Sequence, residues 1–597
     1  MGLLSTIKRE YRYISDLLRM LSYVKDVDPN SERLLPDDIE NSVDEFGPNL
    51  AFIEDARIWT YDAFDAYANQ VAHWAVDAGL TRGDCVAIFV RNRLEYVALW
   101  YGLTKVGIIP ALLNYQLASK ALQHCVTISE AKYLIVDHEM SEAYFGAKAD
   151  IADSIIALSA FGPVKGLDSF DAMIAAQSAE RPDRKYRAGI KAGEQLLKMF
   201  TSGTTGLPKA AKVSHVRGQN YMRGFAAGAK CGPEDRMMMV LPMYHATGGL
   251  CGVGCALMKG GAVIVRPKFS ASKFWEECTE YGATLFMYVG ELCRFLLSAP
   301  PHPMERSHNI RFIIGNGLRP EVWPGFVSRF NIPNVIEFYG ATEGNVSLIN
   351  VRGRVGAIGR VPGYLKHKFN IDVIEYDVDS GRNVRGRDGL AVRTKPGVVG
   401  EMIGEIKEDE ARFRFDGYEN RAATEKKILR GVFKPGDKWF RTGDLVRRDK
   451  DGYFYFVDRV GDTYRWKAEN VATNEVAGVL SGFPGIVQAN VYGVAVPGHD
   501  GRAGMASIVT DKDIDLAALY AHVTAELPHY ARPVFLRLQQ ETDTTSTFKF
   551  KKTDLVKAGF DHAKISDPLY YAPPRGDTYE PLSAQTVTDI ENGEVRL

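Results

Sequence analysis

The stretch FTSGTTGLPKA at residues 200–210 places two glycines, four hydroxyl side chains and one lysine within eleven residues. Glycine adopts backbone conformations that let neighbouring N–H groups converge on an anion, hydroxyl groups add donors, and lysine adds positive charge. The composition therefore predicts a loop that binds the phosphates of a nucleotide, with a plain surface loop as the alternative. It is not a Walker A loop, because Gly203 and Gly206 are only three residues apart and Pro208 precedes Lys209.

The composition of the whole chain excludes several classes of protein. Its 597 residues carry a formal net charge of −1, so no basic field favours nucleic acid as a partner. The seven cysteines form no CxxC pair and no cluster with histidine, which argues against zinc and disulfides and favours a reducing cytoplasm. No GxGxxG fingerprint opens a helix, so a nicotinamide cofactor has little support. No apolar stretch reaches the ~20 residues that span a bilayer.

Apolar β-branched runs alternate with helical patterns over most of the chain, which is typical of an α/β fold whose loops at strand ends build binding sites. A helix is predicted at 94–107, and strands are predicted at 86–90, 133–138, 262–267, 284–290, 312–317 and 335–340. The chain from 353 to 393 is charged, rich in glycine and expected to be irregular. The last ~135 residues, with a strand at 487–496 and a helix from Leu516 to Leu527, are interpreted as a small α+β domain.

Further motifs follow the phosphate loop in a fixed order: LPMYHATGG (241–249), GNGLRPEVW (315–323), EFYGATEGN (337–345), WFRTGDL (439–445), FVDRVGDTYRWKAEN (456–470) and TTSTFKFKK (544–552). Together with the loop, this set resembles the adenylate-forming superfamily of acyl-CoA synthetases, luciferases and adenylation domains, from about residue 45 to residue 580. EFYGATEGN, DTYRWKAENVAT, PGHDGRAGMA and TFKFKK are similar to the fatty acid transport protein and very-long-chain acyl-CoA synthetase branch.

The resemblance implies an α/β fold with a large N-terminal domain of mixed sheets and flanking helices, and a small, mobile C-terminal α+β domain. The expected boundaries are an amphipathic helix in residues 1–30, an AMP-binding domain at 31–458 and a mobile domain at 459–597. The implied activity is an AMP-forming ligase that uses ATP, Mg²⁺ and CoA to convert a long-chain or very-long-chain fatty acid to acyl-CoA. A ligase for a bulky, bile-acid-like acid and a membrane-associated fatty acid uptake protein are the alternatives.

The resemblance also implies the nucleotide contacts. The β- and γ-phosphates are assigned to Thr201, Ser202, Gly203, Thr204, Thr205, Gly206 and Lys209. The adenine and the α-phosphate are assigned to Gly315, Asn316, Gly317, Tyr339, Gly340, Ala341 and Thr342. Asp444 and Arg459 are assigned to the ribose hydroxyls, because a carboxylate accepts two hydrogen bonds from a diol; an Asp–Arg salt bridge is the alternative.

Catalytic roles are implied for Lys549, Glu343, Thr204 and His245. Lys549 would bind the carboxylate of the acid and the α-phosphate together, and its alternative is an ordinary surface lysine. Glu343 and Thr204 are the expected magnesium ligands, since Mg²⁺ prefers oxygen donors. His245, in PMYH, would line the acid site, with a satisfied core histidine as its rival.

Rotation of the small domain between the two half-reactions is implied as well, with Gly461 or Asp462 as the pivot. Around the acid site, the glycines either open space for an aliphatic chain or make tight helix–strand contacts; they are Gly248, Gly249, Gly252, Gly254 and Gly290.

Apolar residues recur every three or four positions near the N-terminus: Leu4, Ile7, Tyr11, Ile14, Leu18 and Leu21. The spacing predicts an amphipathic helix with basic side chains off the apolar stripe. Such a helix either contacts an anionic membrane surface through residues 1–25 or packs on its own protein. The expected location is the cytoplasm, with peripheral contact to the inner face of a membrane as an extension, and a homodimer is left open.

Overall fold

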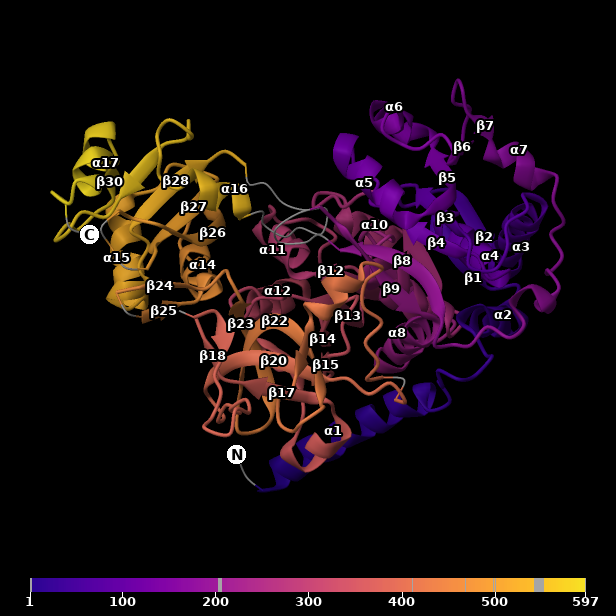
Figure 1. The fold of residues 1–597 in the computed structure, drawn as a ribbon, viewed down its shortest axis with the longest axis horizontal. Helices are drawn as coiled ribbons and strands as arrows, with labels where there is room; N and C mark the ends of the chain where they lie inside the picture. The colour runs from indigo at the N-terminus through magenta and orange to yellow at the C-terminus, as the bar shows by residue number, and fades with distance from the viewer. Residues whose placement is uncertain are drawn as a thin grey trace. The chain divides into compact units, whose positions relative to one another are not determined.

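The computed structural model describes residues 3–201, 207–378, 380–410, 412–467, 469–497, 499, 501–541, 552–595 and 597 (Figure 1). Its chain divides into two compact units. The first comprises Met1–Leu318, Gly325–Arg354 and Glu405–Ile428, and the second comprises Arg319–Pro324, Val355–Gly404 and Leu429–Leu597.

Two mixed sheets form the framework of the first unit. One has the order β15-β14-β13-β12-β10-β11-β1-β2, with bounds Ser347–Asn350, Val335–Gly340, Phe312–Asn316, Leu285–Val289, Arg236–Met239, Ala262–Val265, Leu50–Glu54 and Arg57–Thr60. The other has the order β7-β6-β5-β3-β4-β8-β9, with bounds Asp168–Ser169, Ile156–Ala160, Ala131–Asp137, Cys85–Phe89, Ile109–Leu112, Gln195–Thr201 and Lys209–Ser214. Their central strands pair in parallel and are buried along their length, which explains their continuous apolar runs.

Helices pack around these sheets. Those of the first unit, with most of α12, are α1 Leu3–Val24, α2 Leu35–Phe46, α3 Tyr61–Asp77, α4 Tyr96–Lys105, α5 Ser119–Ser129, α6 Ser141–Lys148, α7 Phe170–Ala175, α8 His215–Gly228, α9 Val253–Leu257, α10 Phe274–Glu280, α11 Gly290–Ser298, α12 Trp323–Phe330 and α13 Arg421–Glu425. A π-helical segment, Thr247–Gly252, precedes α9. Such segments are rare and often lie at functional sites.

The second unit contains two larger sheets. One has the order β16-β23-β22-β20-β17, with β21 (Ile428–Arg430) beside β22 and bounds Ala357–Arg360, Tyr453–Arg459, Lys438–Arg448, Val399–Glu405 and Ile371–Ile374. The other has the order β26-β27-β28-β29-β30, with bounds Ile486–Val494, Ala503–Thr510, Phe535–Gln539, Leu569–Tyr571 and Glu580–Pro581. Two short hairpins pair β18 (Tyr376–Asp377) with β19 (Arg382–Asn383) and β24 (Tyr464–Trp466) with β25 (Glu469–Val471).

Among the described residues, the α-helices that lie wholly within the second unit are α14 Thr473–Ser481, α15 Leu516–Glu526, α16 Thr553–Ala558 and α17 Ala584–Glu591. The residues from Tyr464 to Ile590 share a hydrophobic core of their own. Each predicted strand and helix lies where the sequence indicated, within a few residues. The expectation of irregular chain from 353 to 393 is wrong in part, because β16 and β17 are short, buried strands whose four residues show no alternation of apolar and polar side chains.

Helix α1 confirms the predicted N-terminal helix, and it packs on α8, as Figure 1 shows. The contact includes polar, aromatic and aliphatic residues, among them Met20 beside Gly228 of α8. Tyr13 and Asp16 are buried, Asp16 pairs with Arg352 at 3.1 Å, and Arg19 Nε donates to the Ala227 carbonyl at 2.9 Å. The helix is therefore fixed to its own protein by a face other than the apolar stripe.

The apolar stripe of α1 points to solvent. Ile7 is 55% exposed, Tyr11 74%, Ile14 37% and Leu18 61%. The expectation that the helix packs on its own protein is confirmed, but the stripe is not the packing face. Among the described residues, no helix combines the length and the apolar content needed to cross a bilayer.

Candidate active site

The phosphate-loop motif joins two paired strands of the first unit. Thr201, at the end of β8, lies opposite Lys209, at the start of β9, in an antiparallel register. Residues 202–206, and with them the predicted contacts Ser202, Gly203, Thr204, Thr205 and Gly206, lie outside the described residues. The Lys209 ammonium is exposed and lies 5.5 Å from the ring centroid of Tyr418.

Glu343 meets the same tyrosine. The Tyr418 hydroxyl donates to Glu343 Oε1 at 2.8 Å, although 75 residues separate the two in sequence. Burial, followed by the negative charge of Glu343, raises the pKa of Tyr418 well above its usual value, while a hydrogen bond with Thr201 opposes the shift. The structure thus brings together three predicted site residues, Thr201, Lys209 and Glu343, around one phenol that the motifs did not identify.

The backbone explains how Tyr418 reaches this place. Residue 418 forms an isolated antiparallel bridge with Ala211 of β9. The Lys212 N–H donates to the Gly417 carbonyl at 3.0 Å, and the Glu419 N–H donates to the Ala210 carbonyl at 3.0 Å. Gly417 has φ +73°, a conformation that glycine adopts without strain. This short segment therefore extends the sheet at β9.

A buried ion pair anchors the loop that carries Glu343. Arg217, on α8, donates through Nε to Asp416 Oδ2 at 3.0 Å and through Nη1 to the Thr342 carbonyl at 3.0 Å and to the Gly344 carbonyl. Burial alone would raise the pKa of Asp416, but Arg217 and Ser214 hold it below its usual value. The hydrogen bonds of Arg217 to the two carbonyls fix the backbone at Thr342 and Gly344. Removing either partner of the ion pair would leave a buried charge uncompensated, which is costly.

A second buried carboxylate organises the GNG motif. Glu337, on β14, accepts hydrogen bonds from the Gly317 N–H, from the Leu318 N–H at 3.3 Å and from the Tyr288 hydroxyl. Burial raises the pKa of Glu337 to about 8, against the effect of these donors. A Cβ on Gly315 would lie 2.1 Å from the Tyr288 carbonyl oxygen, so the missing side chain admits Tyr288 on that side.

Asn316 ends β13 and pairs in register with Val289 of β12, while Tyr339 and Gly340 end the neighbouring parallel strand β14. Tyr339 is half-buried, and Gly340 is exposed. Ala341 accepts a hydrogen bond at its carbonyl from the Tyr221 hydroxyl at 3.4 Å. The assignment of these residues to the adenine and the α-phosphate stays a prediction. The residues lie at the adjoining ends of β13 and β14.

His245 lies at one end of a row of aromatic side chains. Its ring lies 4.4 Å from that of Tyr244, which in turn meets Tyr115 edge-on at 5.4 Å. His245 is half-buried, whereas Tyr244 is buried. Asn92 accepts a hydrogen bond from the Met243 N–H at 2.8 Å and donates to the Leu241 carbonyl at 2.8 Å, which fixes the turn before the pair.

The five glycines predicted around the acid site do not leave open space beside their backbone. At each of the five positions a Cβ would lie 2.5 Å or less from a neighbouring atom; they are Gly248, Gly249, Gly252, Gly254 and Gly290. Real Cβ atoms do not approach so closely. Of the two interpretations offered from the sequence, tight packing is therefore right, and free volume for an acyl chain at these positions is wrong.

In the second unit, Asp444 and Arg459 face each other across β22 and β23, with Arg459 Nε 3.7 Å from Asp444 Oδ1. The ion pair is present within this unit, and a ribose role stays a prediction. Gly461 has φ +95°, and Asp462 lies 3.3 Å from the Lys552 ammonium.

Lys549, the predicted catalytic lysine, lies outside the described residues, as does Ala468 of the RWKAEN motif. Lys552, the last residue of the TTSTFKFKK motif, is half-buried. Its ammonium donates to Thr473 Oγ1, at the start of α14, at 2.8 Å, in addition to its contact with Asp462.

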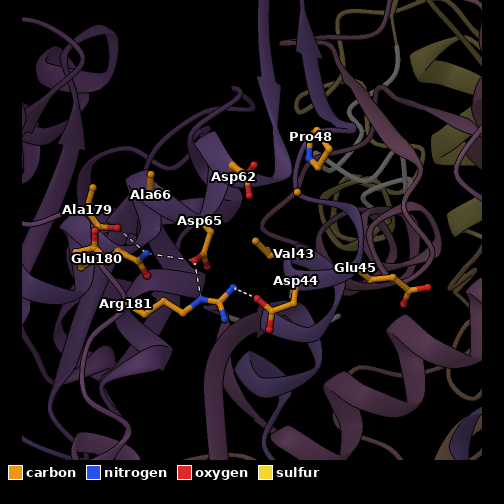
Figure 2. Close-up of a pocket in the computed structure, with 12 residues that line it drawn as sticks. Val43, Asp44, Glu45, Pro48, Asp62, Asp65, Ala66, Ala179, Glu180 and Arg181 are labelled. Atoms are coloured by element: carbon orange, nitrogen blue, oxygen red, sulfur yellow. Dashed lines mark hydrogen bonds and ion pairs between the residues drawn. The ribbon is translucent and has the colours of Figure 1, made fainter.

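A cavity of about 570 Å³ lies elsewhere in the first unit, and Figure 2 shows Arg181 between Asp44 and Asp65 on its wall. Five of its twelve lining residues are acidic and one is basic, and the predicted site residues that the structure describes are not part of it. An anionic wall repels phosphate and carboxylate, so we do not assign substrate binding to this cavity.

Motif reasoning missed Tyr418, Arg217, Asp416 and Glu337. A signal for Tyr418 lies in FDGYENRAAT (415–424), where Gly417 precedes an aromatic residue and Asn420 caps α13. Arg217 sits on α8, outside the quoted motifs, and its role follows from contacts with residues far away in sequence, such as Asp416, 199 residues on.

Comparison with known proteins places these motifs among enzymes. A family model described as AMP-binding enzyme matches residues 39–403, and one described as AMP-binding enzyme C-terminal domain matches residues 475–549. Long-chain fatty acid transport protein 1 of Mus musculus is 40% identical over 548 residues, which cover 90% of this chain and 84% of that protein. Long-chain fatty acid transport protein 2 of Rattus norvegicus is 38% identical over 544 residues, covering 90% and 87% respectively.

Solved structures share the fold. The anthranilate CoA ligase AuaEII, in complex with anthranoyl-AMP, has a TM-score of 0.74 at 19% identity, covering 88% of this chain and 97% of its own. ATP-bound MatB from Rhodopseudomonas palustris has a TM-score of 0.74 at 22% identity, covering 90% and 100%. The fatty acyl CoA synthetase of Mycobacterium tuberculosis has a TM-score of 0.61 at 24% identity, covering 89% and 99%. The predicted α/β fold, with a large N-terminal and a small C-terminal domain, is confirmed.

Proposed function

This chain belongs to the AMP-binding enzyme family, in the branch of the long-chain fatty acid transport proteins, and we propose that it joins a long-chain or very-long-chain fatty acid to coenzyme A at the expense of ATP. The products are acyl-CoA, AMP and pyrophosphate. The observation that carries the proposal is the gathering of Thr201, Lys209 and Glu343 around Tyr418, at the base of the phosphate-loop motif. A hydroxyl, a cation and a carboxylate are the groups that a magnesium-bound polyphosphate requires.

The chemistry proceeds in two displacements. A carboxylate oxygen of the acid attacks the α-phosphorus of ATP, forms an acyl–phosphate bond and expels pyrophosphate. The sulfur of CoA then attacks the acyl carbon, AMP leaves, and the thiol proton passes to solvent. Lys209 would hold the outer phosphates and Lys549 the acid and the α-phosphate, because the first displacement develops negative charge that fixed cations stabilise. Asp444 and Arg459 would hold the ribose.

The residues present fit a magnesium ion. Glu343 offers a half-buried carboxylate, of which Oε1 is held by Tyr418, and hard oxygen donors are what Mg²⁺ prefers. When bound, the ion would neutralise phosphate charge. Thr204, the other proposed ligand, lies outside the described residues.

A screen of acids tests the function. Purified full-length protein with ATP and Mg²⁺ is expected to release pyrophosphate with long-chain fatty acids, and to form the CoA thioester once CoA is added. A ring-containing apolar acid and a short soluble acid form the other arms of the screen. Preference for the ring-containing acid would indicate the bulky-acid ligase, and fatty acid binding without any ATP cleavage would indicate an uptake protein.

For location, we propose a cytoplasmic protein that touches the inner face of a membrane through α1. All seven cysteines are free and buried, which supports a reducing compartment. The stripe formed by Ile7, Tyr11, Ile14 and Leu18 is exposed on a helix whose opposite face is anchored to α8. A helix with exposed apolar residues and basic neighbours lies in the headgroup region of anionic bilayers.

Charge at the edge of the stripe supports an anionic lipid surface. Lys8, Arg12 and Lys25 are exposed, and within the described ranges none of them takes part in an ion pair. Each basic side chain near such a surface contributes about 1 kcal/mol of attraction.

Replacing both Ile7 and Leu18 with serine is expected to weaken binding to vesicles of anionic lipid by about tenfold or more. The reason is that two apolar side chains no longer become buried in the bilayer. Sedimentation with vesicles measures the effect. Deleting residues 1–25 is a poorer test, since the deletion also removes the buried contacts of Tyr13 and Asp16.

The matched control replaces Ile58 and Ile156, two exposed isoleucines on β2 and β6, with serine. It should leave vesicle binding unchanged, and both variants should keep activity on a short soluble acid. Unchanged binding of the α1 variant would contradict the membrane role. A change in oligomeric state in its place would identify the stripe as a contact between two copies of the chain.

A further inference from the structure

We propose that Tyr418 is a positioning residue that orients the magnesium-binding carboxylate of Glu343 and ties it to the phosphate-loop strands. The inference rests on the proposed function, because it takes Glu343 as the metal ligand. Three observations carry it: the hydrogen bond from the phenol to the carboxylate, the anchoring of the Tyr418 backbone, and the position of Lys209 over the same ring.

The hydrogen bond fixes one oxygen of Glu343. Tyr418 donates to Oε1 at 2.8 Å, and within the described part of the chain Glu343 has no other hydrogen bond or ion pair. A carboxylate has two oxygens and about four lone-pair directions, so a single donor leaves capacity for a cation. Partners that orient a metal ligand in this way typically change metal affinity by about 10–100-fold when removed.

The phenol is the donor of this bond, because a carboxylate accepts hydrogen bonds. Tyr418 is 6% exposed, so the phenol is shielded from bulk water. A shielded donor of this kind keeps one carboxylate oxygen in a fixed position.

The backbone around Tyr418 is held on both sides. Its N–H donates to Thr424 Oγ1 at 3.0 Å, and the Thr424 hydroxyl donates back to the Tyr418 carbonyl at 3.2 Å. The bridge to Ala211 joins this segment to β9, the strand that starts at Lys209. A phenol mounted on a sheet edge is more rigid than one on a free loop, which is what orientation of a ligand requires.

The same ring faces the phosphate-binding groups. The Lys209 ammonium lies 5.5 Å from the ring centroid, within the range of a cation–π contact, and Thr201 lies opposite Lys209 in the register of β8 and β9. Tyr418 therefore links the metal carboxylate to two residues that flank the phosphate loop. An alternative is that the tyrosine only packs, in which case its hydroxyl has no influence on the metal.

Replacing Tyr418 with phenylalanine separates these possibilities, because it removes the hydroxyl but keeps the ring and the backbone contacts. The readout is the apparent affinity of the full-length protein for Mg²⁺ in the presence of a non-hydrolysable ATP analogue, followed by thermal shift. We expect Y418F to weaken Mg²⁺ affinity about tenfold, at the low end for such partners, and to leave binding of the analogue without metal within about twofold.

Tyr455→Phe is the matched control. The Tyr455 hydroxyl donates to Asp449 Oδ2 at 3.2 Å, so the substitution also breaks a phenol–carboxylate bond, and neither residue belongs to the site. Y455F should leave Mg²⁺ affinity unchanged. A double variant, Y418F with E343Q, should be no worse than E343Q alone, since the hydroxyl acts through the carboxylate.

The variants test the metal role of Glu343 and the positioning role of Tyr418 separately. If E343Q leaves Mg²⁺ affinity unchanged, the metal role of Glu343 in the proposed function fails. If E343Q weakens Mg²⁺ binding and Y418F does not, the positioning role of Tyr418 is overturned. Additive losses in the double variant also overturn it, because they mean that the hydroxyl acts by a route other than Glu343.

Discussion

Replacing Lys549 with alanine is expected to lower the rate of acyl-adenylate formation by about a hundredfold or more, the loss typical of removing a group that stabilises transition-state charge. The same variant should convert supplied acyl-adenylate and CoA to the thioester at close to the normal rate. The physical reason is that the first displacement brings the carboxylate of the acid against the α-phosphate, two anions whose repulsion a flexible ammonium relieves as charge builds on the phosphate oxygens. The second displacement has no incoming carboxylate.

Pyrophosphate release measures the first half-reaction, and thioester formation from synthetic adenylate measures the second. Lys557→Ala is the matched control, because Lys557 is an exposed lysine on α16, close to Lys549 in sequence. Arginine at position 549 keeps the charge but changes its geometry, so it should recover only part of the rate. Equal loss of both half-reactions in the alanine variant would contradict a role confined to adenylation.

Replacing Glu343 with glutamine is expected to reduce the rate of adenylate formation by about a hundredfold at a moderate Mg²⁺ concentration. It should also raise the Mg²⁺ concentration needed for the half-maximal rate. The amide has nearly the same shape and still accepts the hydrogen bond from Tyr418, but it lacks the charge that a divalent cation requires. The loss should therefore appear in the dependence on metal before it appears in stability.

Pyrophosphate release over a series of Mg²⁺ concentrations gives the measurement. Glu410→Gln, which removes an exposed carboxylate paired with Lys407, is the control and should behave like the unaltered protein. Aspartate at position 343 keeps the charge at a shorter reach and should fall between the two. A Glu343→Gln variant with the normal Mg²⁺ dependence would show that the carboxylate does not bind the metal.

Much of the fold was predictable from local patterns. Strands such as β3 and β5 are continuous apolar runs because parallel strands are buried on both faces, and their ends fall within two residues of prediction. The short strands β16 and β17 were not predictable, since four residues in a glycine-rich, charged region carry no periodicity. Only pairing with β23 and β20 makes them strands.

The glycines show the same limit at the acid site. Sequence indicates that side chains are missing but not what fills the space. At Gly290 the answer is the Gly317 carbonyl oxygen, 1.7 Å from where a Cβ would lie, so the residue joins the start of α11 to the GNG motif. At Gly254 the answer is the Met222 side chain of α8. Both are contacts between segments that are not adjacent in the chain.

The sequence by itself determined the family and the α/β fold, and it predicts the chemistry of the phosphate loop. These features are local, because donors for a phosphate can be recognised within about ten consecutive residues. It also determined that residues 3–24 form an amphipathic helix, since periodicity reports which side chains share a face.

Tertiary structure alone decided which face of that helix packs, and which side chains support the loop residues. Tyr418 and Glu343 are 75 residues apart, and Arg217 and Asp416 are 199 apart. Such contacts depend on how strands and loops pair in space, and no pattern in a single stretch of chain encodes a partner so distant. The motifs thus predict the groups that would touch substrate, whereas the groups that hold them in place are identified only from the tertiary structure.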